Sequence, residues 1–178
     1  MKARILIALS ALALAGTVFA EGKVSDADAK AMKKLAAANL AEIDAGKLAA
    51  DKAKSAEVKN FGQQMVDDHS KMLDELKKLA SAKGVSLPGT PDMGSRAETL
   101  KLRASGDSFD KDYMSEMVKD HQKDVQETAE LAKSVKDPQL KSAVEKAHSK
   151  IQQHLAMAQK IAGSEGAAAG GTKSKSSK

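Results

Sequence analysis

The chain has 178 residues, a formal net charge of +5 and no cysteine, and 42% of its residues are hydrophobic. The lack of cysteine excludes a disulfide framework, thiolate metal ligands and a cysteine nucleophile. Aromatic residues make up only 2% of the chain, which is too few for a surface that stacks nucleic-acid bases. Part of the positive charge lies near the two ends of the chain, on Lys2, Arg4, Lys173, Lys175 and Lys178. Because the remainder is close to neutral, we expect no nucleic-acid partner.

Residues 1–20 have the three parts of a secretory signal peptide. Lys2 and Arg4 form a basic start, 5–14 is an apolar run, and small residues lead to Ala20, after which we predict cleavage. The apolar run is too short to span a membrane, and no later segment is long and apolar enough to do so. We therefore expect an exported protein without a transmembrane segment, periplasmic in a Gram-negative cell or fully secreted.

Strong helix formers dominate the rest of the sequence and runs of strand formers are absent, which predicts an all-α fold. Caps, stops and apolar spacing define four long helices within residues 21–162. They run from the cap at Ser25 to about Ala53, from Ser55 to about Lys83, from Ser108 to about Val135, and from Asp137 to about Ala162. Residues 163–178 are rich in Gly, Ala, Ser and Lys and predict a disordered tail. We expect this basic tail to solubilise the protein or to contact anionic envelope surfaces weakly.

The links between these helices favour a ferritin-like four-helix bundle. The first and last links are very short, so each joins an antiparallel hairpin. The connection 84–107 contains Pro88 and Pro91, is long enough to cross the bundle, and has room for a short helix at about 95–104. A crossover of this kind makes the second and third long helices parallel. An up-down meander is the competing topology.

A pattern of five residues, Met-Val-x-Asp-His, occurs twice in the chain. It reads from Met65 to His69 and again from Met117 to His121. The similarity extends outward, pairing Phe61 with Tyr113, Lys71 with Lys123, and Glu75 with Glu127. Since residues four apart share one face of a helix, each copy places a thioether and an imidazole on the same stripe.

The inner stripe of each predicted long helix contains one residue that could bind a metal. These residues are Glu42, His69, His121 and His154. Their heights along the bundle differ by roughly 8 Å, so four polar groups should meet in one slice of an apolar core. Three interpretations remain open for this slice. It is a hydrogen-bonded layer that fixes helix register, a site for copper, zinc or iron, or a site for an organic ligand or a partner helix.

Three methionines lie one helical turn from the three histidines, at positions Met65, Met117 and Met157. Thioethers beside imidazoles shift the choice of metal toward copper, especially Cu(I). Methionine is also common core filler, so packing alone is the alternative explanation.

Four further residues are candidates for supporting roles. Asp68 and Asp120 each precede a histidine and are expected either to hold a ligand of a neighbouring helix or to be solvated. Asp110 suits the first turn of its helix, and Tyr113 is expected to bury its ring while its hydroxyl forms a hydrogen bond. The Glu-x-x-His motifs of di-iron bundles and the Ser-His-Asp order are absent. An enzyme is therefore the less favoured reading, although an oxidoreductase stays open.

The chain resembles the DUF4142 family, which comprises exported bacterial proteins with a ferritin-like four-helix bundle and no known function. The residues that carry the resemblance are Ala41–Ile43, Gly46–Ala49, Met65–His69, Leu87–Pro88, Phe109–Tyr113, His121 and His154–Ala158. The resemblance covers about 27–161 and implies the fold and an envelope location, but no activity. The related DUF305 group includes copper binders, which favours copper slightly, although the paired histidines of that group are missing here.

We therefore expect an exported protein that binds a transition metal, or is associated with stress, through its histidine and glutamate residues. The alternative is a structural or interaction protein whose buried polar layer only specifies the bundle.

Overall fold

The computed structural model describes residues 24–171, with side chains to residue 164, and these residues form helices without any strand. The long helices are α1 (Asp26–Lys52), α2 (Ala56–Ala82), α4 (Phe109–Ser134) and α5 (Pro138–Gly171). The connection between α2 and α4 contains α3 (Met93–Ala104) and a 3-10 turn, η1 (Gly106–Ser108). None of the helices in this part of the chain combines the length and apolar character needed to span a bilayer. The predicted signal peptide, 1–20, and the residues after 171 lie outside the described residues.

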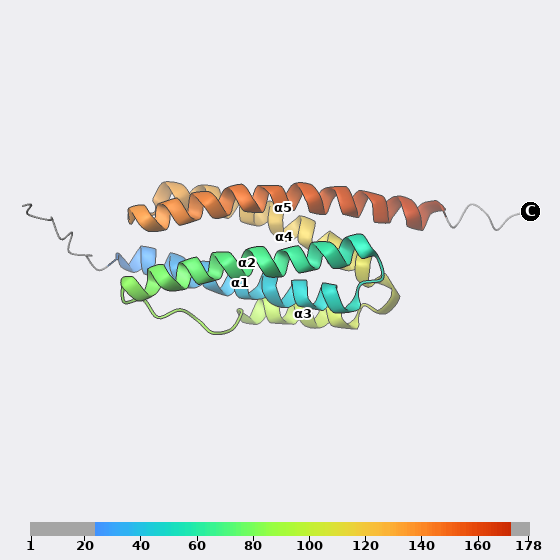
Figure 1. Ribbon diagram of the computed structural model, residues 1–178, viewed down its shortest axis with the longest axis horizontal. Helices are drawn as coiled ribbons and strands as arrows, with labels where there is room; N and C mark the ends of the chain where they lie inside the picture. The colour runs from blue at the N-terminus through green and yellow to red at the C-terminus, as the bar shows by residue number, and fades with distance from the viewer. Residues whose placement is uncertain (1–23, 172–178) are drawn as a thin grey trace, which may run out of the picture.

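The topology is the crossover bundle, and the predicted meander alternative is wrong. The chain runs along α2 in one direction, returns through the long connection and α3, and then runs along α4 in the direction of α2 (Figure 1). Contacts at both ends agree with this arrangement. Asp110 at the start of α4 accepts a hydrogen bond of 2.7 Å from the backbone N–H of Ser55 before α2. Lys83 after α2 forms an ion pair of 3.0 Å with Asp137 after α4.

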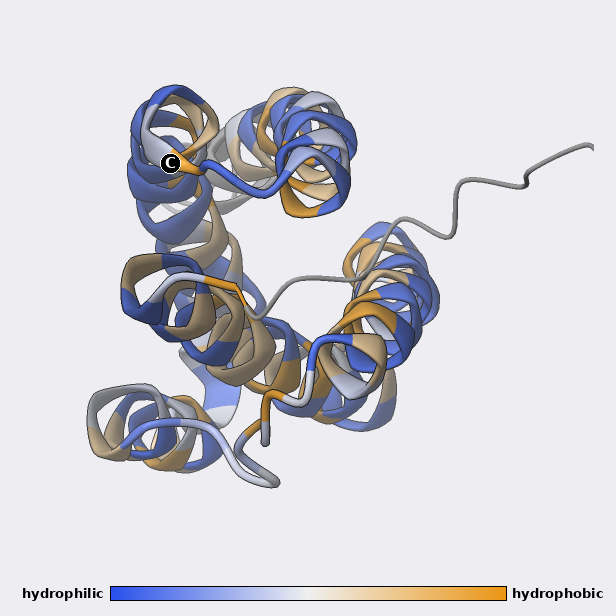
Figure 2. Ribbon diagram, turned by 90° about the vertical axis from the view of Figure 1, so that its left-hand side faces the viewer, coloured by the Kyte–Doolittle hydropathy of each residue, from blue (hydrophilic) through white to orange (hydrophobic). Residues whose placement is uncertain are grey.

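Helix α3 lies outside the four long helices. It packs against α1 and α4 and forms a fifth element on that side of the bundle (Figure 2). Asp92 caps it by accepting a hydrogen bond of 3.1 Å from the backbone N–H of Ser95. The crossover therefore returns the chain to the other end of the bundle and also places the side chains of α3 next to α1 and α4.

Three helix ends differ from the sequence prediction. Neither Ser55 nor Ser108 uses its side chain as a cap. For α2, Asp110 supplies the acceptor from another helix, and its carboxylate also accepts from the backbone N–H of Lys54 at 3.0 Å. Helix α5 does not end near Ala162 but continues to Gly171, so the first part of the predicted disordered tail is helical. The three alanines of this segment favour a helix, whereas each of its four glycines costs about 1 kcal/mol relative to alanine.

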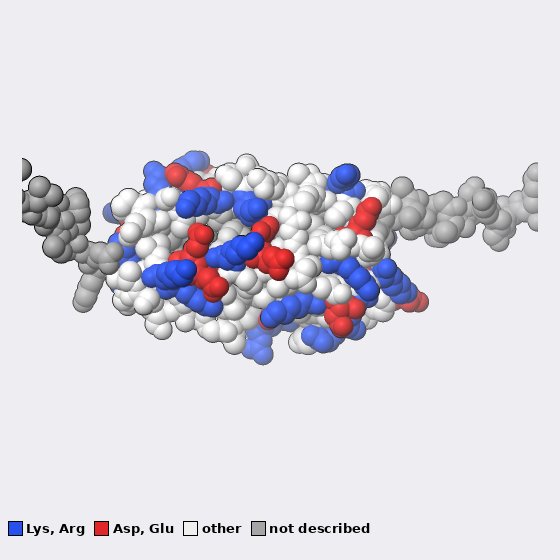
Figure 3. Space-filling view, viewed as in Figure 1, with Lys and Arg blue, Asp and Glu red and all other residues white. Residues whose placement is uncertain are grey.

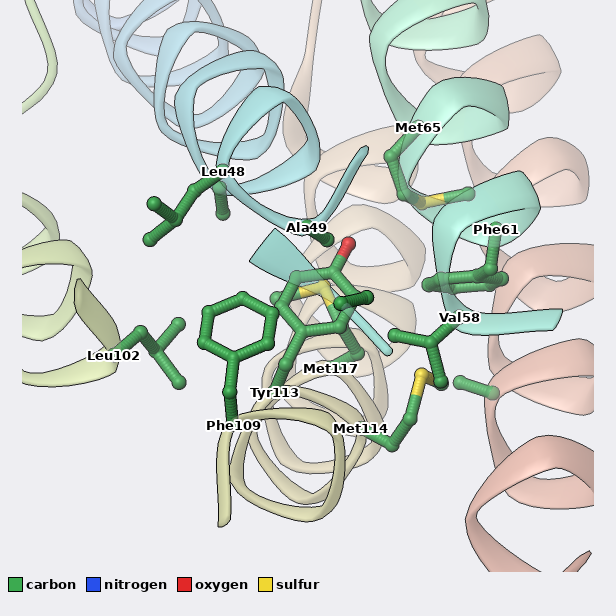
Figure 4. Close-up of a cluster of buried hydrophobic side chains, with 13 residues drawn as sticks. Leu48, Ala49, Val58, Phe61, Met65, Leu102, Phe109, Tyr113, Met114 and Met117 are labelled. Carbon is green, nitrogen blue, oxygen red and sulfur yellow. The ribbon is translucent and has the colours of Figure 1, made fainter. Parts of the chain in front are cut away.

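The apolar core has two parts, with the polar layer between them. One cluster surrounds Phe61, Phe109 and Tyr113 near the α1–α2 link (Figure 4). The other surrounds Met32, Leu76 and residues of the α5 start near the opposite end. The residues Glu42, His69, His121 and His154 each lie along their helix between members of these two clusters. Packing on both sides thus fixes the height of the layer.

Two glycines allow α1 and α2 to approach closely. A Cβ atom on Gly46 would lie 2.7 Å from the carbonyl oxygen of Gly62. A Cβ atom on Gly62 would lie 2.7 Å from the Cβ of Ala49. Because neither separation is sterically allowed, this contact requires glycine at both positions.

Candidate metal centre

Three histidines from three helices meet in the polar layer. His69 comes from α2, His121 from α4 and His154 from α5, and they are 4%, 0% and 0% exposed. Their ring centroids are 5.3 to 6.1 Å apart. One nitrogen of each ring lies within 4.8 Å of one nitrogen of each of the others. The structure thus brings together the three histidines that the sequence singled out.

One nitrogen of each imidazole forms a hydrogen bond with a different group of the protein. The Nδ1 atom of His69 lies 3.1 Å from Oδ1 of Asn39, and Nδ1 of His121 lies 3.0 Å from the carbonyl oxygen of Met117. The Nε2 atom of His154 lies 3.0 Å from a carboxylate oxygen of Asp68.

These partners fix which nitrogen of each ring carries the proton. A carbonyl oxygen and a carboxylate only accept hydrogen bonds, so the nitrogens facing them must donate. The amide of Asn39 presents its oxygen to His69 because its nitrogen donates to the carbonyl oxygen of Leu35 at 2.8 Å. Each ring is therefore left with one unprotonated nitrogen.

The remaining ring nitrogens are buried lone pairs. They are Nε2 of His69, Nε2 of His121 and Nδ1 of His154, and none has a hydrogen-bond partner among the described residues. Buried acceptors are normally satisfied by a donor, so three of them in one layer require an explanation. A metal ion accepts electron pairs from neutral imidazoles and would satisfy all three nitrogens at once.

The environment keeps the three rings neutral. Burial, together with the two neighbouring histidines, lowers the pKa of His69 well below its usual value. Burial also lowers the pKa of His121, and it lowers the pKa of His154 to about 4 even though the hydrogen bond to Asp68 acts in the opposite direction. At neutral pH the rings are therefore in the form that binds metals.

The spacing of the rings is close to that of a metal site. Metal–nitrogen bonds of about 2.0–2.1 Å place ligand nitrogens roughly 3.3–3.6 Å apart in tetrahedral or trigonal geometry. One nitrogen of each ring here lies within 4.8 Å of one nitrogen of each other ring, so side-chain movements of about 1 Å would bring such a set to bonding distance.

Glu42 is buried in the same layer but does not join the cluster of histidine nitrogens. Burial and then the charges of Asp120, Glu98 and Glu116 raise its pKa to about 8. One of its carboxylate oxygens, Oε2, has no hydrogen-bond partner in the described part of the protein. Glu42 lines a cavity of about 100 Å³ together with His69, and it also lines a larger groove of about 450 Å³. Glu42 therefore lies near His69 but outside the close cluster of the three imidazoles.

The methionines belong to the apolar core. Met65 and Met117 are buried in the cluster that contains Phe61 and Tyr113, and Met117 lies behind the Tyr113 ring (Figure 4). Met157 is partly buried and packs against the same cluster. These contacts account for the burial of the methionines without a metal.

The two aspartates of the repeated pattern have different environments. Asp68 holds His154 and also lies 3.6 Å from Nζ of Lys150. Although burial raises the pKa of Asp68, these two partners lower it below its usual value. Asp120 instead lines the groove beside α3, where burial and then Glu116 and Glu98 raise its pKa to about 6.

Asp110 and Tyr113 stabilise the fold: Asp110 caps a helix and Tyr113 packs in the apolar core. Asp110 caps α2, as described above. The Tyr113 ring stacks on Phe109 with centroids 5.9 Å apart and meets Phe61 edge-on at 6.3 Å. The predicted hydrogen bond of its hydroxyl is wrong, because this atom is buried and has no partner within the described residues. The neighbours of the ring that Figure 4 labels, among them Phe109 and Met117, are apolar.

The sequence analysis did not identify three residues of these sites, Asn39, Asp124 and Glu98. Asn39 lies on the inner face of the first helix, so the spacing of three and four residues could have predicted that it faces the core near a histidine. Asp124 lies one turn after His121, and burial and then Glu42 raise its pKa to about 6. Nothing in the sequence indicated that Glu98 lies near other acidic residues, because its position follows from the packing of α3 on the bundle.

Comparison with known proteins supports the assignment by family. The family described as "Domain of unknown function (DUF4142)" matches residues 13–161. The chain belongs to the DUF4142 family. No curated protein matches this DUF4142 chain, and no solved structure matches it. The family description carries no activity, so the function must be argued from the site.

Proposed function

We propose that this DUF4142 protein binds one transition-metal ion, copper(I) or zinc(II), in its histidine layer. The ligands would be Nε2 of His69, Nε2 of His121 and Nδ1 of His154. The observation that carries the proposal is that all three nitrogens are buried lone pairs without a donor, while the opposite nitrogen of each ring has an acceptor. In metal sites a histidine ligand almost always donates its second N–H in this way.

The donor set favours copper(I) or zinc(II) over iron. Imidazole suits all three metals, but non-haem iron sites commonly add a carboxylate ligand, and no carboxylate belongs to this cluster. Burial of a doubly charged ion among neutral ligands costs more than burial of a singly charged one. Copper(I) is therefore the first ion to test, with zinc(II) second.

A purely structural polar layer explains the observations less well. The bonds to Asn39, Met117 and Asp68 would orient the rings in either case. However, a structural layer would leave three buried acceptors unsatisfied, at a cost of about 1–3 kcal/mol for each group.

The protein is further proposed to act outside the cytoplasm. The support is the basic, apolar and small-residue order of residues 1–20, which is typical of an exported protein. Cell fractionation followed by N-terminal sequencing would test this, and a mature protein that retains Met1 in the cytoplasm would contradict it.

The metal site is tested by elemental analysis of untagged protein, followed by titration with Cu(I) and Zn(II). We expect one ion per chain, and loss of binding by at least 100-fold in the double variant His69→Ala/His121→Ala. His148→Ala is the matched control, because this fourth histidine contacts Thr128 at 2.9 Å and lies outside the cluster. No stoichiometric binding to the native protein, or equal binding by the double variant and the control, would refute the proposal.

A further inference from the structure

A groove of about 450 Å³ lies between α1, α3 and α4, on the side of the bundle where α3 packs. Seven acidic side chains and three lysines line it. The face seen in Figure 3 differs, because acidic and basic side chains alternate there. The groove therefore has an excess of negative charge that favours cations over anions.

Three of the acidic side chains converge in this groove. Glu98 comes from α3, and Glu116 and Asp120 come from α4, one turn apart. A carboxylate oxygen of each lies within 4.8 Å of one from each of the others, and all three are partly buried. Like charges this close repel one another, and a bound cation would remove that repulsion.

Glu42 provides an independent indication of a ligand. It reaches the same groove from α1 and is only 7% exposed. Its Oε2 atom is buried and has no partner among the residues described. Because its pKa is about 8, Glu42 is mostly protonated at neutral pH in the metal-free protein. A cation in the groove would displace this proton and give the buried oxygen a partner.

A lysine at the rim is compatible with a bound ion. Nζ of Lys119 lies 2.8 Å from Glu116, but the lysine side chain is 67% exposed. An exposed ion pair of this kind contributes only about 0–1 kcal/mol. The lysine can therefore move into solvent when a doubly charged ion approaches the carboxylates.

We infer that this groove binds a hard divalent cation, of the Mn²⁺, Ca²⁺ or Mg²⁺ class, through carboxylate oxygens of Glu98, Glu116, Asp120 and Glu42. Hard cations prefer oxygen ligands, and carboxylates supply both the atoms and the charge. The chemistry of this site differs from that of the histidine layer, which offers only nitrogen. The inference does not depend on the proposed metal in that layer.

The test uses Mn²⁺ as the probe, with the full mature chain and electron paramagnetic resonance to count bound ions. We expect one bound Mn²⁺ that Ca²⁺ or Mg²⁺ displaces. The double variant Glu98→Gln/Glu116→Gln should weaken binding by at least tenfold, and Glu42→Gln should weaken it by a smaller factor. Both variants keep the side-chain shape, and circular dichroism would establish that they fold.

Two controls make the outcome decisive. Glu130→Gln/Glu145→Gln removes two exposed carboxylates outside the groove and should leave Mn²⁺ affinity unchanged. His69→Ala/His121→Ala should also leave it unchanged, which separates this site from the histidine layer. Absence of bound Mn²⁺, equal affinity in the groove variant and the surface control, or loss of Mn²⁺ in the histidine variant would overturn the inference.

Discussion

At the scale of single residues, the position of each imidazole depends on the group behind it. Asp68 accepts the hydrogen bond of His154 at 3.0 Å and thereby leaves Nδ1 unprotonated. Asp68→Asn would retain an oxygen that can accept this bond but would remove the negative charge. We expect the affinity for copper(I) or zinc(II) to fall by about tenfold, within the range seen when partners of metal ligands are replaced. Competition with a chelator of known affinity measures this change.

The matched control for Asp68 is its neighbour Asp67. Asp67 is exposed and accepts a hydrogen bond of 2.9 Å from Gln63 of the same helix. Asp67→Asn should leave metal affinity unaltered. Equal affinities for the two variants would mean that Asp68 does not support the proposed ligand.

Glu42 should give the metal-free protein an unusual dependence of stability on pH. Its pKa is about 8 in the folded protein, against a usual value of 4.5. Between these values the folded state binds more protons than the unfolded state, so the free energy of unfolding falls as pH rises. The total loss is at most about 5 kcal/mol, because one pKa unit corresponds to about 1.4 kcal/mol.

The glutamine in the variant Glu42→Gln cannot ionise, so the free energy of unfolding of this variant should not fall with pH for this reason. We therefore expect the variant to gain stability relative to the native chain as pH rises from about 5 to about 8. Urea unfolding at several pH values measures the difference, with the exposed Glu145→Gln as the control. A difference between variant and native chain that stays constant with pH would show that Glu42 ionises normally.

At the scale of helices, the contact of α1 with α2 depends on Gly62. Gly62→Ala raises helix propensity by about 1 kcal/mol, but its Cβ would lie 2.7 Å from Ala49. Overpacking of this kind typically costs about 1–3 kcal/mol, so we expect a net loss of stability. In Gly163→Ala, by contrast, the new Cβ meets no atom within 4 Å.

The two glycine variants form a matched pair because both positions are helical. Thermal unfolding should show a lower melting temperature for Gly62→Ala and an unchanged or higher one for Gly163→Ala. If both variants were stabilised, the close approach of α1 and α2 would not be required for the fold.

At the scale of the whole molecule, the histidine layer exists only after three helices have assembled. A metal that binds this layer binds the folded state and not the unfolded chain. At a free concentration about 1,000 times its Kd, such an ion would raise the free energy of unfolding by about 4 kcal/mol. Chemical unfolding with and without the metal measures this, and His69→Ala/His121→Ala should show no increase. An equal increase in that variant would indicate binding elsewhere.

The sequence alone determined the four long helices, the two antiparallel hairpins and the three histidines of the inner layer. This was possible because helix propensity is a local property, and because spacings of three and four residues define one face of a helix. The inner stripes contained His69, His121 and His154, and these residues do lie in the core. The length of 84–107 also favoured the parallel arrangement of α2 and α4.

Only the tertiary structure decided which polar groups meet. Asp68 and Asp120 occupy equivalent places in the repeat, yet Asp68 contacts His154 and Asp120 lines the groove. Periodicity gives the face of a helix but not the neighbour that the side chain meets, because that depends on how helices distant in sequence pack. For the same reason Glu42 lies outside the close cluster of imidazoles, and Glu98 is brought beside α4 by the packing of α3.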